Sequence, residues 1–189
     1  DLKADFNNIP NIVLGDRMYS AVFRKHGYNK IADLADILLS IYKPRPNMDQ
    51  IVKSLNELGV KQYLGSNITP HVYELTKKRF EKEYGNTMLN LIQIGAIVDI
   101  SDYGPVPQSS IPQNKLIKTR KPSPEFFKAY RNNSENPTML TLFIDDKEQN
   151  VNEAIKHGPM ITLLIDAKSP TFVKNLEDAF IALKLVAKK

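Results

Sequence analysis

The sequence predicts an α/β fold with parallel strands, and three observations support this class. Short apolar runs typical of buried strands alternate with amphipathic stretches that have helical spacing. The resulting order of strand, helix and strand is characteristic of a parallel sheet. The chain of 189 residues contains 42% hydrophobic and 25% charged residues, as expected of a globular domain. We therefore expect one domain, with at most a small appendage.

The first 45 residues are predicted to form an irregular segment followed by two short helices. The apolar run Ile12-Val13-Leu14 is surrounded by Asn and Pro, which favour a loop. Between Met18 and Ile41, apolar residues recur at helical spacing on both sides of Gly27. The proline-rich stretch at 43–46 ends this region, because the residue before a proline disfavours helix.

The remaining elements follow from the same two periodicities. Helices are expected at 48–58, 70–84, 123–130, 151–157 and from 170 onward, and strands at 60–64, 91–100, 139–144 and 160–165. Ser123 followed by Pro124 is a typical helix start, since Ser caps the first turn and Pro is tolerated at the first helical position. Residues 101–120 are rich in Pro, Ser and Gln and are predicted to be an inserted loop.

Composition excludes several classes of protein and of site. The chain has no cysteine, which excludes disulfides, thiolate metal sites and cysteine nucleophiles. Its apolar runs are shorter than the roughly 20 residues that cross a bilayer, so no membrane span is expected. The formal net charge is +5, but the basic residues are dispersed, so nucleic acid is not an expected partner. A cytoplasmic location is expected, with export as a bacterial effector as the alternative.

The most informative stretch is the apolar run 141–144, which ends in Asp145 and Asp146. Two adjacent carboxylates at the end of a buried strand repel each other and lose hydration, so they need a cation or a basic partner. Magnesium prefers carboxylate and water oxygens. We therefore predict that Asp145 and Asp146 bind Mg²⁺, with Asn150 orienting one of them. The alternative is an acid pair that only caps the following helix.

Two other segments carry the groups that a phosphoryl-transfer site needs. Ser66 and Asn67 follow the predicted strand at 60–64, and Lys121 precedes the helix that starts at Ser123. Loops at the carboxyl ends of parallel strands converge, so these residues are expected to share one cleft with the acid pair. Ser66 and the next backbone amide would donate to a phosphate oxygen, and Lys121 would supply positive charge. An ordinary turn and a solvated basic loop are the alternatives.

These assignments give a predicted site. The residues expected to bind substrate are Ser66, Asn67 and Lys121. Those expected to take part in catalysis are Ser66, Lys121 and Asp146, and those expected to bind the metal are Asp145 and Asp146. Removing one such preorganised group typically lowers the rate on the order of 10²- to 10³-fold.

The order of these residues resembles the haloacid dehalogenase (HAD) superfamily of aspartate-nucleophile phosphatases. That family's second, third and fourth motifs are a Ser or Thr after an apolar strand, a Lys before a helix, and a strand ending in paired acids with a trailing Asn. They are matched here by 60–67, 121–127 and 143–158. The resemblance covers roughly residues 46–166. It implies a three-layer, Rossmann-like parallel sheet, with a small helical cap in residues 1–45 and the α/β core in 46–189.

The family's first motif, a strand ending in a nucleophilic aspartate with a second aspartate two residues later, has no convincing match. Asp16 follows an apolar run, but Met18 stands two residues further on. The missing strand would be central, and its loss would expose the edges of two neighbours. We therefore expect that strand and the nucleophile to lie upstream of Asp1. The alternatives are Asp16 as the nucleophile and a catalytically inactive relative.

The resemblance implies a magnesium-dependent phosphatase that hydrolyses a phosphate monoester through an aspartyl-phosphate intermediate. A small cap leaves the cleft open to bulky substrates, which favours a phosphoprotein, including one with phosphotyrosine. The alternative is an inactive module of the same fold that binds a phosphorylated ligand. A receiver domain is disfavoured, because its acids precede its lysine, and dehalogenation is the less common use of the scaffold.

Overall fold

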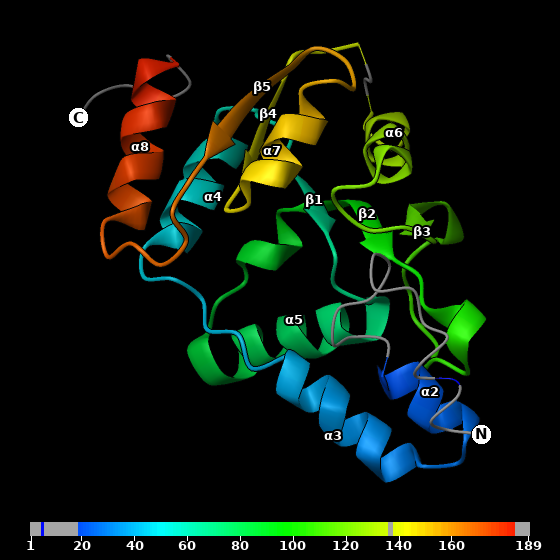
Figure 1. Ribbon diagram of the computed structural model, residues 1–189. Coiled ribbons are helices and arrows are strands. Elements are labelled where there is room, and N and C mark those ends of the chain that lie inside the picture. The colour runs from blue at the N-terminus through cyan, green and yellow to red at the C-terminus, as the bar shows by residue number, and fades with distance from the viewer. Residues whose placement is uncertain (1–4, 6–18, 136–137, 184–189) are drawn as a thin grey trace.

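The computed structural model describes residue 5, residues 19–135 and residues 138–183, and these form a mixed α/β arrangement (Figure 1). The helices of this part are α2 (Tyr19–Lys25), α3 (Asn29–Leu39), α4 (Met48–Glu57), α5 (Pro70–Tyr84), α6 (Pro124–Asn132), α7 (Glu148–Ala154) and α8 (Phe172–Ala182). Its strands are β1 (Tyr63–Ser66), β2 (Gln93–Val98), β3 (Leu116–Ile117), β4 (Thr141–Asp145) and β5 (Met160–Leu164). Short 3-10 turns occur at Met88–Asn90, Ser101–Tyr103 and Gln113–Lys115.

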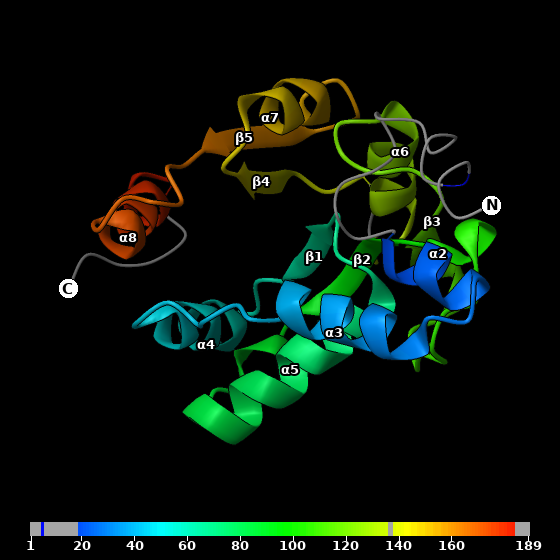
Figure 2. The ribbon, with the colours of Figure 1, turned by 60° about the horizontal axis from the view of Figure 1, so that its bottom comes forward.

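The five strands form two separate parallel sheets. One has the order β1-β2-β3 and the other pairs β4 with β5. Figures 1 and 2 place β4 and β1 next to each other as the inner strands, but the described residues contain no ladder between them. The predicted α/β class with parallel strands is therefore confirmed. Within the described residues, the five strands do not form one continuous sheet.

Helices cover these sheets through separate apolar clusters. In Figure 2, α7 covers one side of β4 and β5, whereas α5 lies on the other side of the molecule, below β1 and β2. Val72 and Tyr73 of α5 pack with Ile97 of β2. Helices α4 and α8 share a second cluster, formed by Ile51, Leu55, Ile165, Leu176 and Phe180. The layers thus depend on helix faces that the apolar spacing in the sequence predicts.

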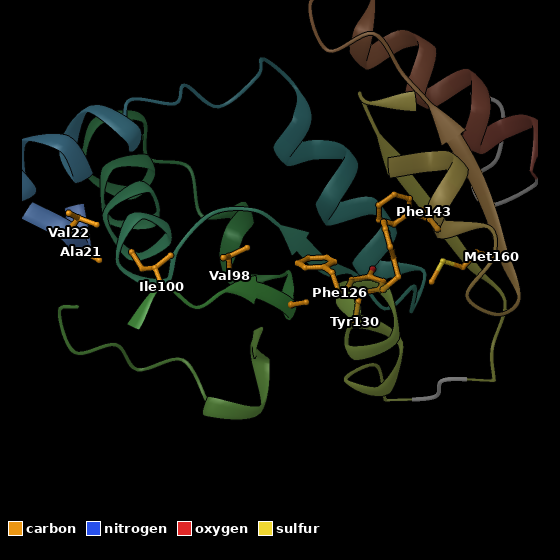
Figure 3. Packing of buried hydrophobic residues seen from close by; sticks show 11 residues of the cluster. Ala21, Val22, Val98, Ile100, Phe126, Tyr130, Phe143 and Met160 are labelled. Carbon is orange, nitrogen blue, oxygen red and sulfur yellow. The ribbon is translucent and has the colours of Figure 1, made fainter. Parts of the chain in front are cut away.

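Helix α6 joins the two sheets. Its buried residues Phe126, Phe127 and Tyr130 share one cluster with Val98 of β2 and with Phe143 of β4 (Figure 3). The rings of Phe127 and Phe143 meet edge to face, with their centroids 5.4 Å apart. Full burial of a side chain of this size stabilises the fold by about 1.5–3 kcal/mol. The aromatic residues of α6 therefore hold β4 in a fixed position relative to β2.

A glycine in β2 allows α6 to approach the sheet. Leu64 pairs with Ile94 and the next residue pairs with Ala96, so Gly95 is the extra residue of a bulge. A Cβ at Gly95 would lie 2.6 Å from Cε2 of Tyr130. Tyr130 is itself buried, and this burial raises the pKa of its hydroxyl group to about 12. A larger residue at position 95 would therefore push α6 away from β2.

Most predicted elements are present, with shifts at their ends. The two helices around Gly27 are confirmed as α2 and α3, and Ser123 caps α6 by accepting a hydrogen bond from the backbone N–H of Glu125. The segment 101–120 is not only a loop, because it contains β3 and two 3-10 turns. Asp16, the alternative nucleophile, lies outside the described residues.

Candidate functional site

Lys121 and Asp145 form an ion pair where β4 ends. Asp145 is the last residue of that strand, and Lys121 lies in the connection between β3 and α6. The Lys121 Nζ atom is 2.5 Å from Oδ2 of Asp145, and the two side chains are only 12% and 6% exposed. The ammonium also lies 5.6 Å from the ring centroid of Phe143. An aromatic ring at this distance favours a cation, so it adds to the stabilisation of the charged lysine.

The second carboxylate oxygen of Asp145 accepts hydrogen bonds from residues that follow it closely in the sequence. Oδ1 accepts hydrogen bonds of 2.9 Å from the backbone N–H of Lys147 and from Nδ2 of Asn150. Burial alone would raise the pKa of Asp145, but the Lys121 ammonium and these hydrogen bonds outweigh it and hold the pKa below its ordinary value. Asp145 is therefore ionised at neutral pH. The contact from Asn150 agrees with the orienting role predicted for that residue.

Asn67 attaches the end of β1 to Lys121. Its Nδ2 donates to the backbone carbonyl of Lys121 over 3.2 Å, and its Oδ1 accepts from the backbone N–H of the same residue over 2.7 Å. The sequence predicted a substrate-binding role for Asn67 but did not indicate this contact. Asn67 thus positions Lys121, and its substrate-binding role stays a prediction.

Ser66 ends β1, directly before Asn67. Its Oγ accepts a hydrogen bond of 3.2 Å from the backbone N–H of Ile68. This contact uses the oxygen as an acceptor, so the hydroxyl hydrogen can be donated elsewhere. The structure therefore connects Ser66, Asn67, Lys121 and Asp145 through neighbouring residues and hydrogen bonds at the carboxyl ends of β1 and β4.

Asp146 differs from Asp145 in its environment. It is exposed and lies just before helix α7, whereas Asp145 is buried. Carboxylates are the type of ligand that Mg²⁺ prefers, so the donor chemistry of the pair fits the predicted metal. In the described ranges, however, no group of three or more His, Cys, Asp or Glu side chains is arranged to hold a metal. The other ligands of a magnesium ion here would be water, substrate or residues outside these ranges.

The described residues also form a cavity of about 210 Å³. It is lined by residues of α2 and α3, by the start of α5 and by the segment 99–113. Ser66, Lys121 and Asp145 are not among its lining residues. The cavity and the ion pair are thus different features.

Comparison of the chain with protein-family models, with curated proteins and with solved structures finds no match. Within the part of the chain that the structure describes, no helix combines the length and hydrophobicity needed to span a membrane. The functional inference therefore depends on the residues of the site and their geometry.

Proposed function

We propose that this chain belongs to a HAD-like, magnesium-dependent phosphatase that hydrolyses a phosphate monoester. The observation that carries the proposal is the 2.5 Å contact between Lys121 Nζ and Asp145 Oδ2, at the carboxyl end of a parallel strand. Ligands of open α/β sheets gather at such ends. A mostly buried ammonium held there can stabilise the charge on a transferred phosphoryl group.

Each side chain has a distinct role in this proposal. Lys121 neutralises phosphoryl oxygens, Ser66 donates its hydroxyl hydrogen to one of them, and Asn67 holds Lys121 in place. An aspartate carboxylate forms a bond to phosphorus while the ester oxygen leaves and takes up a proton, and water then hydrolyses the aspartyl phosphate. That aspartate lies outside the described residues, and the candidates are Asp16 and a residue upstream of Asp1.

Asp145 and Asp146 are the residues that would hold Mg²⁺ in this proposal. When bound, the ion would neutralise negative charge that develops on the phosphoryl group. Lys121, with smaller contributions from Asn150 and the backbone N–H of Lys147, keeps the pKa of Asp145 below its ordinary value, and the last two groups orient its Oδ1 atom. Asp146, which is exposed, is free to turn toward the cation.

The proposal includes a completed sheet. We infer that β5-β4 and β1-β2-β3 are parts of one Rossmann-like sheet in which a further strand pairs with β4 and β1, and that α2 and α3 form a small cap. Two observations support this inference. The inner strands are adjacent in both views (Figures 1 and 2). Contacts from Asn67 to Lys121 and from Lys121 to Asp145 bring their carboxyl ends to the same side.

Hydrolysis of p-nitrophenyl phosphate with Mg²⁺ tests this function. Replacement Lys121→Met should lower kcat/KM on the order of 10²- to 10³-fold, because it removes a preorganised charge. Lys128→Met is the matched control, since Lys128 is an exposed residue of α6. Equal rates for Lys121→Met and the unaltered protein would reject the assignment. A phosphotyrosine peptide assayed in parallel tests the proposed phosphoprotein substrate.

An inactive binding module is the second candidate, and one observation favours it: the sequence has no convincing match to the first motif, in which a second aspartate follows the nucleophile two residues later. Calorimetric titration with orthophosphate separates the two functions. The chain is a binding module if the unaltered protein binds orthophosphate but hydrolyses no ester, and if Lys121→Met abolishes that binding. Hydrolysis that depends on Lys121 would identify the enzyme, and the absence of both would reject the two candidates together.

A further inference from the structure

Helix α3 and the residues next to it present large apolar side chains to solvent. Seven such side chains between positions 28 and 42 are 44% to 56% exposed, and we call this set the α3 face. Its members are Tyr28, Ile31, Leu34, Ile37, Leu38, Ile41 and Tyr42. In Figure 1, α3 is the lowest helix, and in Figure 2, where that side comes forward, it lies toward the viewer. Single exposed apolar residues are ordinary, but a group of this size on one helix marks an interaction site.

The polarity of α3 is reversed relative to an ordinary surface helix. Its buried residues are Ala32 and Asp36, and Ser40 at its end is buried as well. Asp36 accepts a hydrogen bond of 2.7 Å from Arg24 of α2, while Leu39 packs against the apolar cluster of α5. A surface helix normally buries its apolar stripe and exposes its polar side. The apolar stripe of α3 therefore remains available for a partner.

The area of the α3 face is sufficient for an interface between two proteins. Seven half-exposed side chains of these types offer on the order of 500 Å² of apolar surface. A symmetric dimer buries this surface twice, so on the order of 1,000 Å² would be removed from water, which is the size that a specific interface needs. A second copy of the chain therefore supplies enough area without any other contact.

The order of residues in the α3 face fits a second copy of the same chain. Four of its side chains are spaced by three, four and three residues, which is the spacing of a seam between packed helices. They are Ile31, Leu34, Leu38 and Ile41, so the seam reads Ile, Leu, Leu, Ile in either direction. In a two-fold symmetric contact, residue i meets residue j and j meets i. Two antiparallel copies of α3 therefore place Ile31 opposite Ile41. They also place Leu34 opposite Leu38.

The charges around the α3 face agree with this pairing. In the antiparallel register, Lys30 lies opposite Tyr42 of the second copy, so no two lysines oppose each other and a cation meets an aromatic ring. Asp33 and Asp36 are paired with Arg24 within each copy. A bilayer surface fits less well, because helices that lie on membranes carry Lys and Arg on their polar side. The polar side of α3 carries the two aspartates instead.

We infer that the α3 face is a homodimer interface, in which α3 of one copy packs antiparallel against α3 of a second copy. The ion pair of Lys121 and Asp145 is not part of this face. The inference therefore does not depend on phosphatase activity, and its failure would leave the proposed function unaffected. It adds a partner that the proposed function does not name.

Analytical ultracentrifugation over a wide range of protein concentration tests dimer formation. An interface of this size should give a Kd of micromolar order. Leu34→Gln/Leu38→Gln should raise that Kd at least 100-fold, because each dimer loses four leucine side chains from its interface. Leu58→Gln/Leu140→Gln is the matched control, since these leucines are 58% and 64% exposed and lie outside the α3 face. The control should dimerise as the unaltered protein does.

Disulfide cross-linking tests the antiparallel arrangement, because the chain has no cysteine of its own. An Ile31→Cys chain mixed with a tagged Ile41→Cys chain should form a mixed disulfide-linked dimer under mild oxidation. Ile31→Cys alone should not cross-link, because the two copies of position 31 would lie about 15 Å apart along the helix axis, and a disulfide spans at most about 7 Å between Cα atoms. These single replacements at exposed positions also decide the matter if Leu34→Gln/Leu38→Gln does not fold.

Four results would overturn the inference. The chain could stay monomeric well above micromolar concentration, or it could form a dimer that Leu34→Gln/Leu38→Gln leaves unchanged. Ile31→Cys could cross-link with itself as fast as with Ile41→Cys. Finally, a monomer that binds vesicles of phosphatidylglycerol and phosphatidylcholine through Leu34 and Leu38 would assign the α3 face to a lipid surface.

Discussion

The carboxamide of Asn67 makes two hydrogen bonds to the backbone of Lys121, a residue 54 positions further along the chain. The bonds measure 3.2 and 2.7 Å and involve both polar atoms of the side chain. Asn67 follows β1, and Lys121 contacts the end of β4. One amide therefore connects the two sheets at the end where the candidate site lies.

Replacing Asn67 should affect both stability and the candidate site. In Asn67→Ala the backbone N–H and C=O of Lys121 lose their partners, which should lower the free energy of unfolding by about 1–3 kcal/mol. Urea denaturation measures this, with Asn152→Ala on the exposed face of α7 as the control. A loss no larger than that of the control would show that the two bonds do not hold Lys121.

Gly95→Ala should destabilise the protein although the change adds only a methyl group. The new Cβ would lie 2.6 Å from Cε2 of Tyr130, so α6 or the bulge must shift, at a cost of about 1–3 kcal/mol. Combining Gly95→Ala with Tyr130→Leu in a double-mutant cycle isolates this clash. We expect the second change to relieve part of the first. Additive losses of stability would locate the strain elsewhere.

The pH dependence of stability should report the ion pair of Asp145. Its pKa is below the ordinary value of 3.8, so the stabilisation is complete above pH 3.8 and disappears as the pH falls through the lower folded-state pKa. At neutral pH, Asp145→Asn should cost about 3 kcal/mol, because Lys121 loses its partner. In acid the two proteins should converge. Denaturation from pH 7 to pH 2 measures this, with Asp178→Asn on α8 as the control for loss of a carboxylate.

Asp146 should be required for magnesium but not for folding. It is exposed, so Asp146→Ala should change the free energy of unfolding by less than about 0.5 kcal/mol. The same change should abolish magnesium-dependent hydrolysis of p-nitrophenyl phosphate and weaken Mg²⁺ binding in calorimetry. Asp166→Ala is the matched control, because Asp166 is an exposed aspartate that lies shortly after β5. Its Oδ1 accepts a hydrogen bond from the backbone N–H of Lys168. If both variants bind Mg²⁺ equally, Asp146 is not a metal ligand.

Local sequence patterns predicted the helices better than the strand ends. Helix α5 begins and ends where its apolar spacing and Pro70 indicate, at Pro70–Tyr84. The strand predicted from Val60 begins later, because the backbone N–H of Val60 bonds to the carbonyl of Leu55 and completes the end of α4. Strand β3 was missed, since its two residues follow a proline-rich segment and pair only through β2.

The residue types of the site were predictable, but their connections were not. Adjacent carboxylates after an apolar strand indicated a charged site, and the structure pairs Asp145 with Lys121. The contact of Asn67 with the Lys121 backbone depends on the spatial approach of distant segments, which local periodicity does not encode. The two ion pairs of Arg24 with Asp33 and Asp36 are likewise a property of packing between α2 and α3. No sequence motif signals it.

The inner edges of β1 and β4 have no ladder partner within the described residues. A strand that bonds to both edges would therefore be held by two sets of backbone hydrogen bonds at once. In the completed sheet that we propose, such a strand would end next to Lys121, because the carboxyl ends of β1 and β4 meet there.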